Sequence, residues 1–153
     1  YIKDGMSDPE KEIRIIEWLV GNCSYEKGED WSRGTAYSCI VLGKAQCSGY
    51  ADAFLQTAKL CGLDVRYVYN ERHAWNLVKL DGDWYHVDVT WEDPIGKQNY
   101  GFGNLSNRYI NLTDDQIRAV EYHSTWETPE LAAAGTKYGP AVVAECLAKE
   151  SRQ

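Results

Sequence analysis

The first apolar residues of the chain recur three or four positions apart, at Ile13, Ile16, Leu19 and Val20. Asp8 and Pro9 precede them, and these residue types are typical of a helix N-cap and of the first helical position. The pattern therefore predicts a helix over residues 9–21.

A second helical pattern follows the tripeptide Cys47-Ser48-Gly49. Gly62 marks its end, because glycine is the most common residue just after a helix. We expect an alanine-rich helix at the centre of the domain, with Cys47 one or two residues before its start. The apolar residues of this pattern share one helical face, formed by Tyr50, Ala51, Phe54, Leu55, Ala58 and Cys61.

Three segments after this helix are predicted to be strands. Residues 65–69 are rich in β-branched and aromatic side chains. Residues 73–80 and 83–91 flank Asp81-Gly82, a dipeptide that is typical of two-residue hairpin turns. The last two segments are therefore expected to form an antiparallel hairpin.

The remaining segments predict a loop and two helices. Residues 95–107 are rich in Gly and Asn and are expected to form a loop. Thr113 and Gln116 form a capping-box pattern for a short helix, and Gly139-Pro140 precedes a last helix. The order of helix, helix, antiparallel strands and helices indicates an α+β fold.

Length and composition indicate one globular domain. The chain has 153 residues, 44% of them hydrophobic, which suits a single core. We therefore expect one domain over residues 1–153, with a C-terminal helical extension over about residues 113–153.

The charge balance excludes some classes of function. With a net charge of -7 and no basic stripe, the chain is not expected to bind nucleic acid. The acidic balance is compatible with a cationic partner such as a lysine-bearing amine.

No apolar run approaches the ~20 residues of a membrane span. The start of the chain shows no signal peptide, so a mature protein or an excised domain is expected.

One of the five cysteines stands out by its position. Cys47 lies at the start of the central helix, where unpaired N–H groups and the helix dipole favour a negative charge. Its pKa is therefore expected to be lowered, which favours the nucleophilic thiolate. The competing interpretation is a buried structural cysteine. No cysteine spacing is typical of zinc, so no metal site is expected at Cys23, Cys39, Cys47, Cys61 or Cys146.

The hairpin supplies a base and an acid for this thiol. If Asp81-Gly82 is a two-residue turn, His73 and Asp88 lie diagonally on one face of the hairpin, ~7–8 Å apart at the backbone. A three-residue loop would place them on opposite faces. The sequence thus predicts a nucleophile, a general base and an orienting carboxylate in Cys47, His73 and Asp88.

The other two histidines are expected to be structural. His86 shares the hairpin face of Asp88, but its i+2 spacing to Asp88 offers no third group, so a structural histidine or one at the cleft rim is expected. His123 follows the short helix and is expected to pack or to cap it.

Three motifs together resemble the transglutaminase-like superfamily, above all its small bacterial members. The resemblance covers about residues 9–126 and is strongest over residues 43–94. The motifs read GKAQCSGYADAF at 43–54, RHAWN at 72–76 and WYHVDVTW at 84–91.

This resemblance implies a papain-like α+β fold, in which a central helix packs on an antiparallel sheet. It also implies that Cys47, His73 and Asp88 occupy the positions of a catalytic triad. Activities in the family include glutamine–lysine crosslinking and amide hydrolysis, and some members have no catalytic activity. The chemistry needs no metal and no cofactor.

Further expectations concern the surroundings of the triad. The backbone N–H of Cys47 is expected to stabilise the oxyanion, with the Gln46 side chain as a second candidate. Trp31 and Trp75 are expected to line the cleft. We expect a protein or peptide substrate, including cell-wall peptide, and a monomer that is secreted or attached to the cell surface.

Two alternatives to a thiol enzyme stay open. The first is a catalytically silent module of the same fold that binds peptide or cell wall. The second is an extracellular scaffold stabilised by disulfides.

Overall fold

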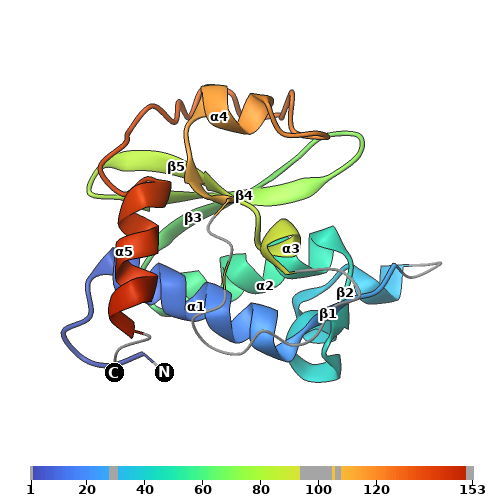
Figure 1. Ribbon diagram of the computed structural model, residues 1–153. Helices are drawn as coiled ribbons and strands as arrows, with labels where there is room; N and C mark the ends of the chain where they lie inside the picture. The colour runs from blue at the N-terminus through green and yellow to red at the C-terminus, as the bar shows by residue number, and fades with distance from the viewer. Residues whose placement is uncertain (1, 28–30, 94–104, 106–107, 151–153) are drawn as a thin grey trace.

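The computed structural model of the protein describes residues 2–27, 31–93, 105 and 108–150. The fold is α+β, with helices on both faces of an antiparallel sheet (Figure 1). Its elements are α1 (Asp8–Asn22), β1 (Ser24–Tyr25), η1 (Trp31–Arg33), η2 (Ser38–Leu42), β2 (Lys44–Ala45), α2 (Cys47–Leu60), β3 (Asp64–Tyr69), β4 (Ala74–Leu80), β5 (Asp83–Val87), α3 (Val89–Glu92), β6 (Ile110–Leu112), α4 (Asp114–Arg118) and α5 (Pro140–Glu150).

Two layers of helices enclose the sheet. In Figure 1, α1 and α2 lie below the sheet, while α4 and the segment that follows it lie above. The lower core includes Ile16 and Leu19 of α1, Phe54 of α2 and Val78 of β4. The upper core is smaller and consists of Val68, Trp75, Leu77, Leu112, Ile117, Trp126 and Ala133.

The hairpin register follows the sequence prediction. Leu80 pairs with Asp83, and Asn76 pairs with Val87. Asp81 and Gly82 both have positive φ, at 50° and 86°, which a two-residue hairpin turn of type I′ requires. The sheet order is β3-β4-β5-β6, and the edge strand β6 was not expected from the sequence.

The second hairpin strand is shorter than expected. The prediction of a strand over residues 83–91 is wrong, because β5 ends at Val87 and the chain turns into α3. The cause is Asp88, whose side chain accepts a hydrogen bond from the Trp91 N–H at 3.0 Å and caps α3. This cap fixes the Asp88 side chain at the open end of the hairpin.

Two helix starts also differ slightly from the expectation. Ser7, and not Asp8, is the N-cap of α1, because Ser7 and Glu10 form a capping box. Cys47 does not precede α2 but is its first residue, with Gln46 as the N-cap. The capping box of Thr113 and Gln116 is confirmed at the start of α4.

Two further expectations concern the loop after the hairpin and the absence of a membrane span. The loop predicted over residues 95–107 lies almost wholly outside the described residues. Across the part of the chain that is described, no helix combines the length and the apolar character needed to cross a membrane.

Gly49 is where the first turn of α2 meets the segment between η1 and η2. A Cβ added at Gly49 would lie 2.7 Å from the Arg33 carbonyl oxygen and 2.7 Å from the Ala45 Cβ. The approach fixes the start of α2, and with it the position of Cys47.

We expect Gly49→Ala to destabilise the fold by about 1–3 kcal/mol, because backbone must move to admit the methyl group. Gly21→Ala in α1 is the matched control, since nothing lies within 4 Å of its added Cβ. That control should be neutral or stabilising by about 0.5–1 kcal/mol. Urea unfolding of both variants tests the contrast, and equal effects would contradict the close approach.

Candidate active site

Cys47 lies at the N-terminus of α2 and at the wall of a cleft of about 580 Å³. Its side chain is half-buried. The first N–H groups of a helix have no carbonyl partner from a preceding turn, so this end of α2 favours a negative charge. The cleft is lined by Tyr25, Lys27, Cys47, Arg72, His73, Thr90, Trp91, Asp93 and Tyr122.

His73 and Asp88 meet at the open end of the hairpin, just beyond the last strand pair. The Nε2 atom of His73 lies 2.6 Å from Oδ2 of Asp88. Burial favours the neutral imidazole, but hydrogen bonds to Asp88 and Cys47 outweigh it and raise the pKa of His73 to about 9. Since Nε2 faces Asp88, Nδ1 is the ring nitrogen left for Cys47.

The electrostatic environment favours a thiolate at Cys47. Burial alone would raise the pKa of this thiol, but the hydrogen bond and the charge of His73 outweigh it. The Ala74 N–H also lowers the pKa of Cys47, which lies below its ordinary value. A lowered thiol pKa beside a raised imidazole pKa is the pattern of a thiolate–imidazolium pair.

Asp88 is buried and holds its charge through hydrogen bonds. Burial would raise the pKa of this carboxyl group, yet hydrogen bonds from His123 and His73 keep it below its ordinary value. Its backbone N–H donates to the Tyr109 carbonyl at 2.9 Å. The carboxylate is therefore fixed by main chain and side chain together.

His123 joins the site, which the sequence did not predict. Its Nε2 atom lies 2.6 Å from the same Asp88 oxygen that contacts His73. Its ring is fully buried, at 0% exposure. The two residues are 35 positions apart in the chain, and no local pattern around His123 signals the contact.

His86 forms a separate buried network on the upper face of the sheet. Its Nδ1 accepts a hydrogen bond from the Trp75 indole at 3.0 Å, and its Nε2 lies 2.8 Å from Asp114 Oδ1. Burial is the main cause that lowers the pKa of His86 to about 4. The structural role expected for His86 is consistent with these contacts, and Asp114 supplies the third group that the sequence did not show.

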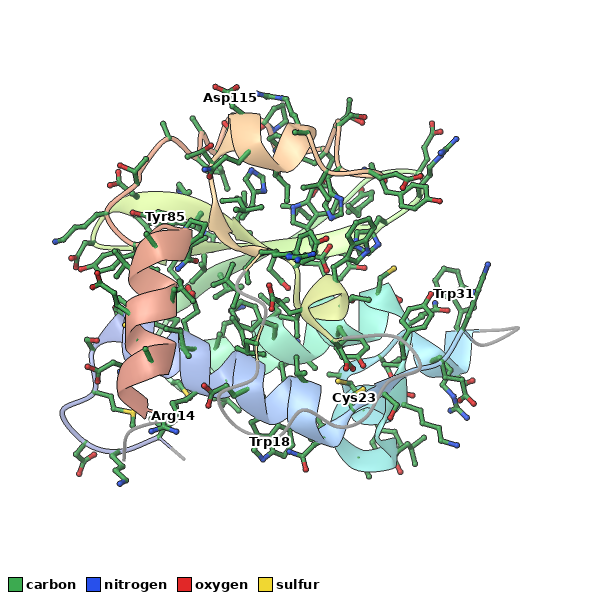
Figure 2. The ribbon with its side chains drawn as sticks, viewed as in Figure 1. Arg14, Trp18, Cys23, Trp31, Tyr85 and Asp115 are labelled. Carbon is green, nitrogen blue, oxygen red and sulfur yellow. The ribbon has the colours of Figure 1, made fainter. Side chains whose placement is uncertain are left out.

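The two tryptophans expected in the cleft do not line it. Trp75 is only 1% exposed, because it points into the upper core, where its ring stacks 6.0 Å from that of His73. Trp31 is 83% exposed and lies at the edge of the molecule (Figure 2). The aromatic residues that line the cleft are instead Trp91, Tyr122 and Tyr25.

Gln46 lies next to the thiol but is occupied by local contacts. Its backbone N–H donates to the Arg33 carbonyl at 2.9 Å, and its side-chain amide lies 3.3 Å from Ser48 Oγ. An oxyanion role for its side chain stays a prediction. Cys47 is the first residue of α2, and the oxyanion role of its N–H likewise stays a prediction.

None of the five cysteines forms a disulfide in the structure. Cys23 and Cys39 are buried and form a hydrogen-bonded pair, while Cys61 and Cys146 are half-buried. The structure therefore offers no support for a scaffold that depends on disulfides.

Among the described residues, one cluster has the composition of a metal site: His73, Asp88 and His123. The two contacts of 2.6 Å between nitrogen and oxygen are hydrogen-bond distances. Ligands around a tetrahedral zinc ion, with bonds of ~2.0–2.1 Å, lie ~3.3 Å apart. The cluster therefore fits a hydrogen-bond network better than a metal cage.

Comparisons with known proteins agree with this geometry. The kyphoscoliosis peptidase of Mus musculus is 26% identical over an alignment of 133 residues, and the match covers 73% of this chain and 20% of the peptidase. The Homo sapiens protein of the same name is 26% identical over an alignment of 110 residues, and the match covers 59% of this chain and 17% of that protein. The chain thus spans a fifth or less of the length of these curated relatives.

A crystal structure of a TGase has the same core fold, with a TM-score of 0.51 and 18% identity. The similarity covers 61% of this chain and 29% of that chain. A family model described as the transglutaminase-like superfamily matches residues 1–89, a span that contains Cys47, His73 and Asp88. Since this match covers more than half of the sequence, the chain belongs to the transglutaminase-like superfamily.

Proposed function

We propose that the protein is a thiol enzyme that acts on amide bonds of protein or peptide substrates through a cysteine thioester. The observation that carries the proposal is the contact chain of Cys47, His73 and Asp88 at the wall of the cleft. A binding module has no need of a thiol, an imidazole and a buried carboxylate in this order.

The first half of the reaction forms the thioester. The Cys47 thiolate adds to the amide carbonyl carbon, and the Cys47 N–H stabilises the oxygen that becomes negative. The His73 imidazolium gives its proton to the amide nitrogen, the C–N bond breaks, and ammonia or an amine leaves.

The second half of the reaction releases the acyl group. Neutral His73 takes a proton from water or from an incoming amine, which attacks the thioester carbonyl. The C–S bond breaks, and the Cys47 thiolate and the His73 imidazolium are restored. Asp88 keeps the imidazole ring oriented and stabilises its positive charge throughout.

We favour water as the acceptor, in line with the name of the mouse and human peptidases. Transfer to a lysine amine is the competing outcome, and the exclusion of water from the cleft decides between them. The proposal extends to protein or peptide substrates outside the cell or at its surface, with cell-wall peptide among them.

Alkylation by iodoacetamide tests the thiolate directly. Because its pKa is lowered, Cys47 should react faster than an ordinary thiol at neutral pH, and its rate should change a second time near pH 9, where His73 loses its proton. In His73→Ala, Cys47 should react at least about tenfold more slowly at pH 6–7, because a thiol pKa raised by one unit means tenfold less thiolate. Peptide mass spectrometry assigns the label to each cysteine.

Cys61 is the internal control for this experiment. It is half-buried like Cys47 but lies at the opposite, C-terminal end of the same helix, away from His73 and Asp88. Wild-type Cys47 that reacts no faster than Cys61 would rule out the proposed nucleophile and favour a silent binding module.

The acceptor is identified by incubating the protein with a peptide library containing Gln and Asn, with and without a primary amine. We expect cleaved or deamidated peptides, with deamidation adding about one mass unit per event, and no product from Cys47→Ser. An amine adduct as the main product would assign transferase activity instead. The absence of any product from the wild type would contradict the proposed reaction on these substrates.

A further inference from the structure

We propose that His123 is a positioning residue of the thiol site, which as an imidazolium shares Asp88 with His73 and sets the pH range of the Cys47–His73 pair. This inference rests on the proposed function only in taking Cys47 as the nucleophile. The contacts of His123 itself are independent of that role.

The hydrogen-bond partners of His123 fix its protons. Its Nδ1 lies 2.6 Å from the carbonyl oxygen of Glu121, and its Nε2 lies 2.6 Å from Asp88 Oδ2. A carbonyl oxygen and a carboxylate oxygen only accept hydrogen bonds, so both ring nitrogens must donate. Since Asp88 stays ionised, His123 carries both protons and a positive charge.

This charge completes a neutral set of buried groups. The Cys47 thiolate, the His73 imidazolium and the Asp88 carboxylate sum to one negative charge, which burial makes costly. A cationic His123 cancels it. Two indole rings also lie against the His123 ring, with centroids 4.7 Å away at Trp75 and 5.0 Å away at Trp91.

The fold holds the two histidines through one amide side chain. Asn70 accepts a hydrogen bond from the His73 N–H at 2.9 Å with its Oδ1. Its Nδ2 donates to the carbonyl oxygens of Tyr122 and Thr125 at 2.7 and 2.8 Å. Asn70 thus ties the segment that carries His73 to the segment that carries His123.

The residue before His123 has an uncommon backbone conformation. Tyr122 has a φ of 70°, in the left-handed region that costs a non-glycine residue about 1 kcal/mol or more. The hydrogen bond from the His123 N–H to the Val120 carbonyl at 3.1 Å and the two Asn70 contacts maintain it. Such conformations persist where the surrounding contacts over-determine them, and they cluster at functional sites.

The charge of His123 has a defined effect on the pH profile. A nearby cation makes protonation of its neighbours less favourable, so its loss raises the pKa of Cys47 and of His73 together. Both pH-dependent steps of the Cys47 alkylation rate, one for the thiol and one for His73, should therefore move to higher pH. Among the described residues, the titratable groups that face His123 are Asp88, His73 and His86, and Cys47 is linked to it through His73. The nearest cations are Arg72, which lies over the Tyr122 ring, and Arg118, which lies over the Trp126 ring.

The test compares the pH dependence of Cys47 alkylation in the wild type, in His123→Gln and in His86→Gln. Glutamine keeps an N–H donor for Asp88 but carries no charge. His86→Gln is the matched control, because His86 is equally buried and hydrogen-bonded but one of its ring nitrogens accepts a hydrogen bond from the Trp75 indole N–H and so carries no proton. We expect both steps of the profile to move up by about one pH unit in His123→Gln and to stay in place in His86→Gln.

A second measurement does not depend on the variants folding. In the wild type, 15N NMR at pH 7 should show both ring nitrogens of His123 protonated. One unprotonated nitrogen would overturn the proposal, and so would an unshifted profile in a folded His123→Gln variant, or a stoichiometric metal ion bound by His123. Slow alkylation of wild-type Cys47 would sink the proposed function instead, and the NMR result would then decide the state of His123 by itself.

Discussion

The buried carboxylate of Asp88 is the interaction on which the rest of the site depends. One of its oxygens caps α3, and the other accepts hydrogen bonds from His73 and His123. An ionised carboxyl group without partners would not survive burial, so these donors must all be present for the charge to persist. Because the donors come from three separate segments, satisfying one side chain fixes the arrangement of all three.

This constraint explains where the site lies in the fold. Cys47 comes from α2 in the layer below the sheet, while His123 comes from the segment after α4 in the layer above (Figure 1). His73 and Asp88 lie between these two layers, at the end of the hairpin and beyond its last strand pair, Asn76 and Val87. The hairpin end is thus the place where the two layers meet.

The parts of this arrangement that were predictable from the sequence are those set by local geometry. The Asp81-Gly82 turn fixes the register, and the register puts His73 and Asp88 on one face. The early end of β5 was missed because the Asp88 side chain caps α3 and so ends the strand. The alternation of apolar residues does not show where such a cap replaces strand pairing. His123 was missed because its contact depends on how a distant segment packs, for which the sequence carries no periodic signal.

The order of charges along the network links folding to reactivity. Cys47, His73, Asp88 and His123 alternate in sign, so each charge is stabilised by a neighbour that the chain brings from elsewhere. In an unfolded chain the thiol has no imidazolium beside it and no helix terminus beneath it, and most of it stays protonated at neutral pH. The reactive thiolate therefore arises only when both layers have closed on the hairpin end, which makes the nucleophile a property of the completed fold.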